Sequence, residues 1–186
     1  MRRLTSAVAL TLLAGLLSSA QAQTSLTFTV AGNEVSQGII IDDNRFGAAF
    51  IGLANGTLPG YSGFFAASIN YTPAAPGAGV VNYIVGGHWA LTVFRYGFHR
   101  GTVYGTFDPA GINEVRWNSP EVSPVALRAD VLTTLSITGG TQPRFEGASG
   151  SGSFTGVLDH SPLYDDNPRT ISPKVGGILT LNITAP

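Results

Sequence analysis

The sequence predicts an all-β domain, built as a barrel or a sandwich of short antiparallel strands. Apolar and polar residues alternate with a period of two in several segments, which is typical of strands. Glycine (24 residues) and proline (11 residues) interrupt nearly every window long enough to hold a helix. Charged residues make up only 11% of the chain, whereas a typical soluble domain carries about 25%.

The alternation is clearest in two segments. In 179–184, every odd-numbered residue is Leu or Ile and every even-numbered residue is Thr or Asn. In 88–96, Trp89, Leu91 and Val93 share one face, and the opposite face is also fairly apolar, which predicts a well-buried strand. The Gly-Gly pairs at 86–87, 139–140 and 176–177 are expected at strand boundaries. Together these signals predict strands near 25–30, 46–54, 63–71, 80–86, 88–96, 101–107, 112–118, 130–138, 152–158 and 177–184.

Residues 1–22 have the layout of a secretory signal peptide. Two arginines at 2–3 precede an apolar stretch over 7–17 and a small-x-small cleavage pattern at 20–22. The apolar stretch is too short for a membrane span, which needs about 20 residues. We therefore expect cleavage after Ala22, one domain over residues 23–186, and a secreted or periplasmic location.

Composition excludes several classes of function. The chain contains no cysteine, which rules out thiol catalysis, disulfide exchange and cysteine metal sites. Its formal net charge is −1, so it has no basic field to attract nucleic acid and no polybasic segment for anionic lipid. We expect no cofactor and, once the leader is removed, no membrane partner. A small hydrophobic ligand is the expected partner, and assembly into a homo-oligomer stays open.

The most distinctive segment runs from 137 to 154. It resembles the GGTG-x-F-x-G-A-x-G signature of dirigent proteins and the barrel relatives of allene oxide cyclase. The matching residues are Gly139, Gly140, Thr141, Phe145, Gly147, Ala148 and Gly150. One departure is the pair Gln142–Pro143, which replaces a single Gly of the pattern and lengthens the turn by one residue.

The resemblance covers about the last third of the chain and implies a particular architecture. It implies an antiparallel calycin- or dirigent-like barrel of about eight strands with an apolar cavity, with a β-sandwich as the alternative. Plant members of the family are often trimeric. No catalytic residue is carried over by the resemblance.

Aromatic side chains on consecutive predicted strands form the candidate ligand-binding set, together with two polar groups that would orient a ligand. The set is Trp89, Arg95, Tyr96, Tyr104, Glu114 and Trp117. The alternative is that these are ordinary core and surface residues, since aromatics dominate any β core.

Other chemistry-bearing residues fit no known site pattern. The histidines at 88, 99 and 160 match no metal-binding spacing, and the Asp-Asp-Asn runs at 42–44 and 165–167 lack the spacing of a calcium loop. The serines at 149–153 do not fit the Gly-x-Ser-x-Gly elbow. We therefore predict no metal site, and the catalytic residues, if any exist, stay unknown.

These observations favour an exported, non-catalytic barrel that binds a small apolar ligand in its interior. One alternative is an enzyme or stereochemical guide of the dirigent or cyclase kind that uses the same cavity. Another is a structural surface domain with a filled interior and no ligand. An open apolar cavity would favour the ligand-binding protein or the enzyme, and two convergent titratable groups inside it would favour the enzyme. A solid interior would favour the structural domain.

Overall fold

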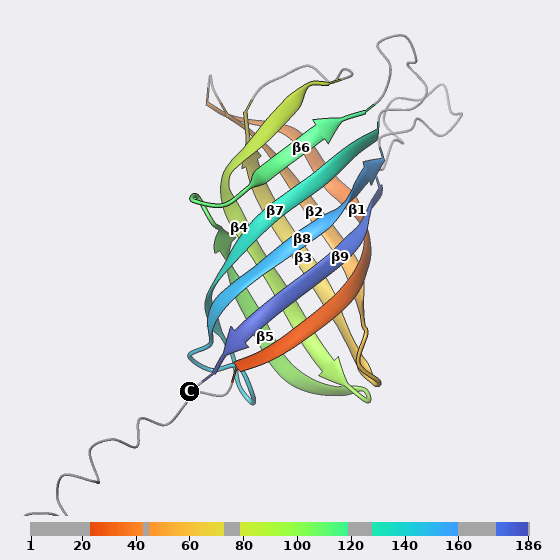
Figure 1. Ribbon diagram of the computed structural model, residues 1–186, viewed down its shortest axis with the longest axis vertical. Coiled ribbons are helices and arrows are strands. Elements are labelled where there is room, and N and C mark those ends of the chain that lie inside the picture. The colour runs from red at the N-terminus through yellow and green to blue at the C-terminus, as the bar shows by residue number, and fades with distance from the viewer. Residues whose placement is uncertain (1–22, 43–44, 73–78, 119–127, 160–173, 186) are drawn as a thin grey trace, which may run out of the picture.

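The computed structural model describes residues 23–42, 45–72, 79–118, 128–159 and 174–185. These residues form nine strands and no helix (Figure 1). The strands are β1 (Gln23–Asp42), β2 (Arg45–Gly56), β3 (Tyr61–Tyr71), β4 (Val81–Arg95), β5 (Phe98–Phe107), β6 (Asn113–Trp117), β7 (Arg128–Gly140), β8 (Ser149–Asp159) and β9 (Lys174–Thr184). The expected leader, residues 1–22, lies outside the described residues. No helix in the described part of the chain is long and apolar enough to cross a membrane.

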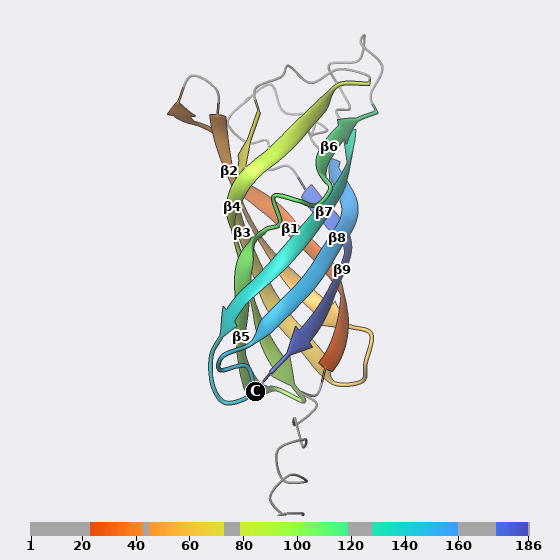
Figure 2. The same ribbon diagram turned by 60° about the vertical axis from the view of Figure 1, so that its left-hand side comes forward.

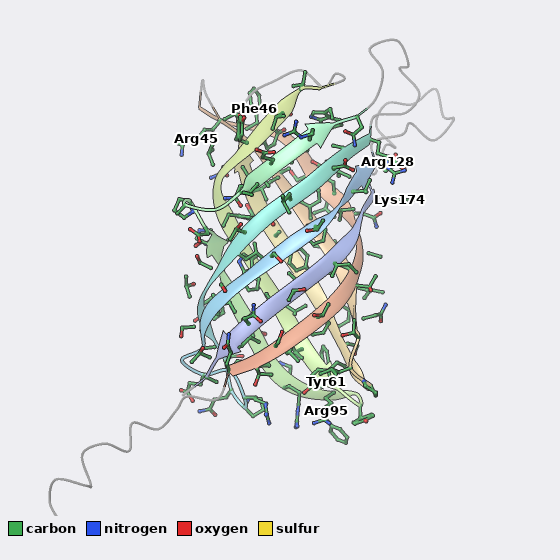
Figure 3. The ribbon with its side chains drawn as sticks, in the orientation of Figure 1. Arg45, Phe46, Tyr61, Arg95, Arg128 and Lys174 are labelled. Atoms are coloured by element: carbon green, nitrogen blue, oxygen red, sulfur yellow. The ribbon has the colours of Figure 1, made fainter. Side chains whose placement is uncertain are left out.

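The sheet closes on itself into an antiparallel barrel, which confirms the predicted fold class. Eight strands follow one another around the barrel in the order β1-β2-β3-β4-β5-β7-β8-β9, and β9 pairs back with β1. The extra strand, β6, continues the line of β5, because β4 and β7 each pair with β5 along one part and with β6 along another. All the strands are tilted relative to the long axis of the barrel (Figures 1 and 2). We call the end that carries Arg128 and Lys174 the upper end, and the end that carries Tyr61 and Arg95 the lower end (Figure 3).

Most strands extend beyond their predicted ranges, and two differ most from the prediction. β1 continues from the predicted 25–30 to Asp42, paired with β2 through three register shifts. The predicted strands 80–86 and 88–96 are one strand, β4, in which the register against β3 shifts between Ile84 and Gly86. The extra residue changes the phase of alternation, so that both Ile84 and Trp89 face inward. The sequence suggested two strands here because this phase change interrupts the period of two.

Only one of the three Gly-Gly pairs ends a strand, contrary to our expectation. Residues 139–140 are the last of β7, whereas 86–87 lie inside β4 and 176–177 lie inside β9. Gly87 has a φ of 127°, and a Cβ built on it would overlap the carbonyl oxygen of Ser68 on β3. The glycine therefore permits a close approach of two strands within the sheet, rather than marking the end of one.

The interior of the lower half of the barrel is filled. Leu179, Leu181 and Ile183 of β9 are 0–1% exposed, and the intervening Thr180, Asn182 and Thr184 are half-buried on the other face, as predicted. The same core holds the three inward residues Trp89, Leu91 and Val93 of β4. At the lower end, the connection between β7 and β8 contributes the buried side chains of Phe145 and Ala148. Two residues of the family-like signature therefore serve here as core.

Candidate ligand-binding site

An apolar cavity of about 60 Å³ lies in the upper half of the barrel interior. Every one of the nine strands contributes to its wall, and thirteen of the fourteen lining residues are apolar. The lining consists of Val30, Phe50, Phe65, Ala67, Ile69, Ile84, Phe107, Val115, Val131, Thr133, Leu135, Phe154, Leu158 and Val175. For comparison, an engineered apolar cavity of about 150 Å³ stays dry and binds benzene. The present cavity is less than half that size, so it suits the end of an alkyl chain or part of a small ring.

Small residues shape the wall of the cavity and the packing behind it. Ala67 of β3 lines the wall between Phe65 and Ile69, and it is paired in register with Trp89. Gly156 and Gly177 face each other on β8 and β9, and a Cβ built on either would lie within 2.9 Å of the ring of Phe154. The phenyl ring of Phe154 therefore occupies the space that side chains at these two positions would need.

Thr133 is the one polar residue of the lining. Its side chain is 2% exposed, and its neighbours on the inward face of β7 are Val131 and Leu135. Within the described residues, its hydroxyl oxygen Oγ1 has no hydrogen-bond partner. Because this oxygen is itself buried, Thr133 contributes only apolar surface to the cavity, and the exposed wall is apolar throughout.

A polar layer lies above the cavity, formed by inward-facing residues at the upper ends of the strands. The indole Nε1 of Trp117 donates a 2.7 Å hydrogen bond to Oδ1 of Asn82, whose Nδ2 donates a 2.8 Å bond to the carbonyl oxygen of Thr72. Both side chains are buried. Glu34, the register partner of Phe50, is also buried, at 7% exposure. A carboxyl group therefore lies beside the apolar cavity, but it is not part of the lining.

The structure places two of the six candidate residues, Trp89 and Trp117, inside the barrel. Trp117 lies one inward position above Val115, which lines the cavity. Trp89 pairs with Ala67 of the lining, and its Nε1 donates a 3.1 Å hydrogen bond to the carbonyl oxygen of Thr106. Neither indole is itself part of the cavity wall, but each is next to a residue that is.

Arg95 lies at the lower end of the barrel (Figure 3), and Tyr96 follows it in the chain. The Arg95 guanidinium carbon lies 5.3 Å from the ring centroid of Tyr61 and 5.6 Å from that of Tyr96, a cation–π arrangement. Tyr96 has a φ of 51° in the turn between β4 and β5, and its backbone N–H donates to the carbonyl oxygen of Gly60. The two residues thus join the β4–β5 turn to the β2–β3 turn.

Tyr104 and Glu114 are on the outer surface of the barrel. The side chain of Tyr104 is 42% exposed and lies against Gly139 of β7, where a Cβ would collide with its ring. Glu114 accepts a 3.0 Å ion-pair hydrogen bond from Arg116 of the same strand. The six candidate residues therefore do not come together: two are inside the barrel, two lie on its outer wall and two at its lower end.

Sequence reasoning missed Thr133, although a signal for it exists. Thr133 stands between the apolar residues Val131 and Leu135 in the alternation of β7, at a position where the pattern calls for an apolar residue. A polar residue at an inward position is the kind of departure that marks functional sites. The neighbouring Thr134 points outward, so the period of two separates the two threonines.

The remaining chemistry-bearing residues form no cluster in the described residues. His88 and His99 are exposed on the outside of the barrel, and the ring of His99 packs edge-on against Phe94. Ser149, Ser151 and Ser153 are exposed along β8. Where the structure describes the chain, no three His, Asp or Glu side chains are grouped so that they could hold a metal ion. His160, residues 43–44 and residues 165–167 lie outside the described residues.

Comparison of the chain with protein-family models, with curated proteins and with solved structures finds no match.

Proposed function

We propose that this protein is an exported, non-catalytic binding protein that holds a small apolar molecule in the upper half of its barrel. The observation that carries the proposal is the apolar cavity lined by residues of all nine strands. Ligand pockets are lined predominantly by apolar and aromatic side chains, and thirteen of the fourteen residues of this lining are apolar.

Filling an apolar cavity of this size is energetically favourable. An unfilled apolar cavity costs about 24 cal/mol for each Å³ in a protein core, so the 60 Å³ space costs about 1.4 kcal/mol. An apolar guest would recover part of this cost through dispersion contacts with the lining. The gain is modest, so we expect weak affinity for a molecule no larger than the cavity and stronger affinity for one that also reaches toward the upper end.

The residues that line the cavity are better suited to binding a ligand than to catalysing a reaction. General acid–base catalysis needs a titratable group within hydrogen-bond reach of the reacting atoms. The lining consists of thirteen apolar residues and one threonine, none of which titrates near neutral pH. This favours a carrier over an enzyme or stereochemical guide of the cyclase kind.

The proposal is tested by filling the cavity. Ala67→Leu places a larger side chain into the lining, whereas Ala66→Leu places the same side chain on the exposed outer face of the same strand. Titration of residues 23–186 with cyclopentane, toluene and hexane, followed by methyl NMR shifts of Val131 and Leu135 and by tryptophan fluorescence, measures binding. We expect saturable binding that Ala67→Leu abolishes and Ala66→Leu preserves.

Two outcomes would contradict the proposal. Saturable binding that survives Ala67→Leu would place the ligand elsewhere. A lack of saturable binding by the unchanged protein would support the alternative of a structural domain with a filled interior.

A further inference from the structure

The lower end of the barrel carries large apolar side chains that are exposed at the tips of two turns. Phe98, at the start of β5, is 73% exposed, and Tyr96, in the turn between β4 and β5, is 66% exposed. Leu58, in the turn between β2 and β3, is 48% exposed. Single exposed apolar residues are ordinary, whereas a contiguous group of them marks an interaction surface.

These side chains belong to one surface, because the two turns contact each other. The backbone N–H of Tyr96 donates a 2.7 Å hydrogen bond to the carbonyl oxygen of Gly60, and a Cβ built on Gly60 would overlap the ring of Tyr96. The apolar surface continues up the outer wall of the barrel, where the ring centroids of Phe94 and Phe64 lie 5.7 Å apart and Phe64 is 58% exposed. The lower end and the adjoining wall thus form one aromatic patch.

Three arginines lie at the same end of the barrel. Arg95 and Arg100 are on the two strands of the β4–β5 hairpin, and the backbone N–H of Arg144, in the connection between β7 and β8, donates to the carbonyl oxygen of Arg100 at 3.1 Å. None of the three forms an ion pair with another described residue. The one carboxylate in these connections is Glu146, so the lower end carries a net positive charge, although the formal net charge of the whole chain is −1.

Protruding aromatic and aliphatic side chains beside arginines are complementary to an anionic lipid surface. Aromatic side chains are favoured at the level of the headgroups, and arginines are attracted by the negative charge of anionic lipids. A second copy of the chain fits this end less well. End-to-end contact of two copies would bring the arginines of both together, and like charges across an interface are unfavourable.

We propose that the lower end of the barrel docks onto an anionic lipid surface, with Leu58, Tyr96 and Phe98 inserted among the headgroups and the three arginines against the phosphate groups. The proposal is independent of the cavity and goes beyond the proposed function. Sequence analysis led us to expect no membrane partner, because no segment of the chain is polybasic. The arginines at 95, 100 and 144 share one end only in the folded barrel.

The experiment measures binding to unilamellar vesicles by flotation. Residues 23–186 are used, because the apolar stretch at 7–17 would bind lipid by itself. One set of vesicles contains phosphatidylcholine alone, and the other contains phosphatidylcholine and phosphatidylglycerol in equal parts. Partition coefficients are measured at low and at high salt.

Two apolar variants and one charge variant test the docking surface. They are Phe98→Ser, Leu58→Ser and Arg144→Gln, all at exposed positions. The matched controls are Tyr83→Ser and Arg116→Gln. Both controls remove an exposed side chain of the same kind where β4 pairs with β6, away from the lower end.

We expect the unchanged protein to bind the mixed vesicles more tightly than phosphatidylcholine alone, and high salt to weaken this binding by screening. Phe98→Ser should lower the partition coefficient about tenfold, because the ring is no longer available for insertion, and Leu58→Ser should lower it about fivefold. Arg144→Gln should lower it about fivefold on the mixed vesicles and leave binding to phosphatidylcholine unchanged. The two controls should bind as the unchanged protein does.

Four results would overturn the proposal. The first is a lack of binding to the mixed vesicles, and the second is equal binding to both kinds of vesicle. The third is a control variant that loses as much binding as its matched test variant, which would place the lipid contact elsewhere. The fourth is a dimer in lipid-free sedimentation that Phe98→Ser dissociates, which would make this end an interface between copies of the chain.

Discussion

The indole nitrogen of Trp117 donates a 2.7 Å hydrogen bond to the side-chain oxygen of Asn82, and both side chains are buried. The bond joins the short strand β6 to the start of β4, where only three residue pairs hold the two strands together. Asn82 also bonds to the backbone of Thr72, at the end of β3. One amide side chain therefore links three segments directly above the cavity.

Replacing Asn82 by leucine should destabilise the protein by about 1–3 kcal/mol. The substitution removes the acceptor of the Trp117 indole and the donor to Thr72 but keeps a side chain of similar size. Asn118→Leu is the matched control, because the bond from Asn118 to Asp130 is exposed and worth little. Denaturant melts measure both variants, and equal free energies of unfolding would mean that the buried bond contributes no more than the exposed one.

Alanine substitutions on the two faces of the C-terminal strand β9 should have different effects on stability. Leu181 is 0% exposed, so Leu181→Ala should cost about 2–5 kcal/mol of folding free energy. Thr180 is half-buried on the outer face, so Thr180→Ala should cost less than about 1 kcal/mol. Chemical denaturation with tryptophan fluorescence as the readout measures the difference. A cost of Thr180→Ala as large as that of Leu181→Ala would contradict the register of β9.

Alanine substitutions at the neighbouring glycines Gly176 and Gly177 of β9 should change the stability of the protein by different amounts. A Cβ built on Gly177 would lie 2.6 Å from the Cα of Gly156 and 2.8 Å from the ring of Phe154, so Gly177→Ala should destabilise by about 1–3 kcal/mol. A Cβ built on Gly176 would meet only the carbonyl oxygen of Val30, at 3.7 Å, an ordinary contact. Gly176→Ala should therefore change stability by no more than about 0.5 kcal/mol. Thermal melts of the two variants test this, and a more harmful Gly176→Ala would refute the assigned facing of the strand.

The exported protein should begin at Gln23. The prediction follows from the small-x-small pattern at 20–22 after a short apolar stretch. N-terminal sequencing or the intact mass of protein recovered from the periplasm or the medium measures the site of cleavage. Recovery of a soluble product that retains residues 1–22 would overturn both the cleavage site and the proposed route of export.

The parts of the barrel that sequence analysis predicted well are those in which alternation is unbroken. In 179–184 the pattern identified both the strand and its inward face, because a period of two is a property of the backbone that each strand carries by itself. β4 was misread as two strands, because its register shift near Gly86 changes the phase of the pattern. The second half of β1 was missed because its pairing with β2 is irregular, with three register shifts.

The candidate site was harder to predict, because it depends on which strands are neighbours and on the position of each residue along the axis of the barrel. Tyr104 and Trp117 both lie on predicted strands, yet one is on the outer wall and the other is inside. Trp89 and Ala67 are paired across two strands, a contact that no local pattern contains. The aromatic residues could therefore be identified from the sequence, but the position of each one in the barrel could not.

By itself, the sequence determined that this chain is all-β, cysteine-free and built from alternating strands, because glycine content and the period of two are local properties that need no knowledge of the partner strands. Tertiary structure alone decided where the interior is filled and where it is hollow. Closure of the barrel brings Ala67, Thr133 and Val175 to one cavity from strands that are far apart in the chain. The physical reason is that the free space at the centre of a barrel is the part of its interior that the inward side chains leave unfilled. The pairing register of the strands decides which side chains meet at each height.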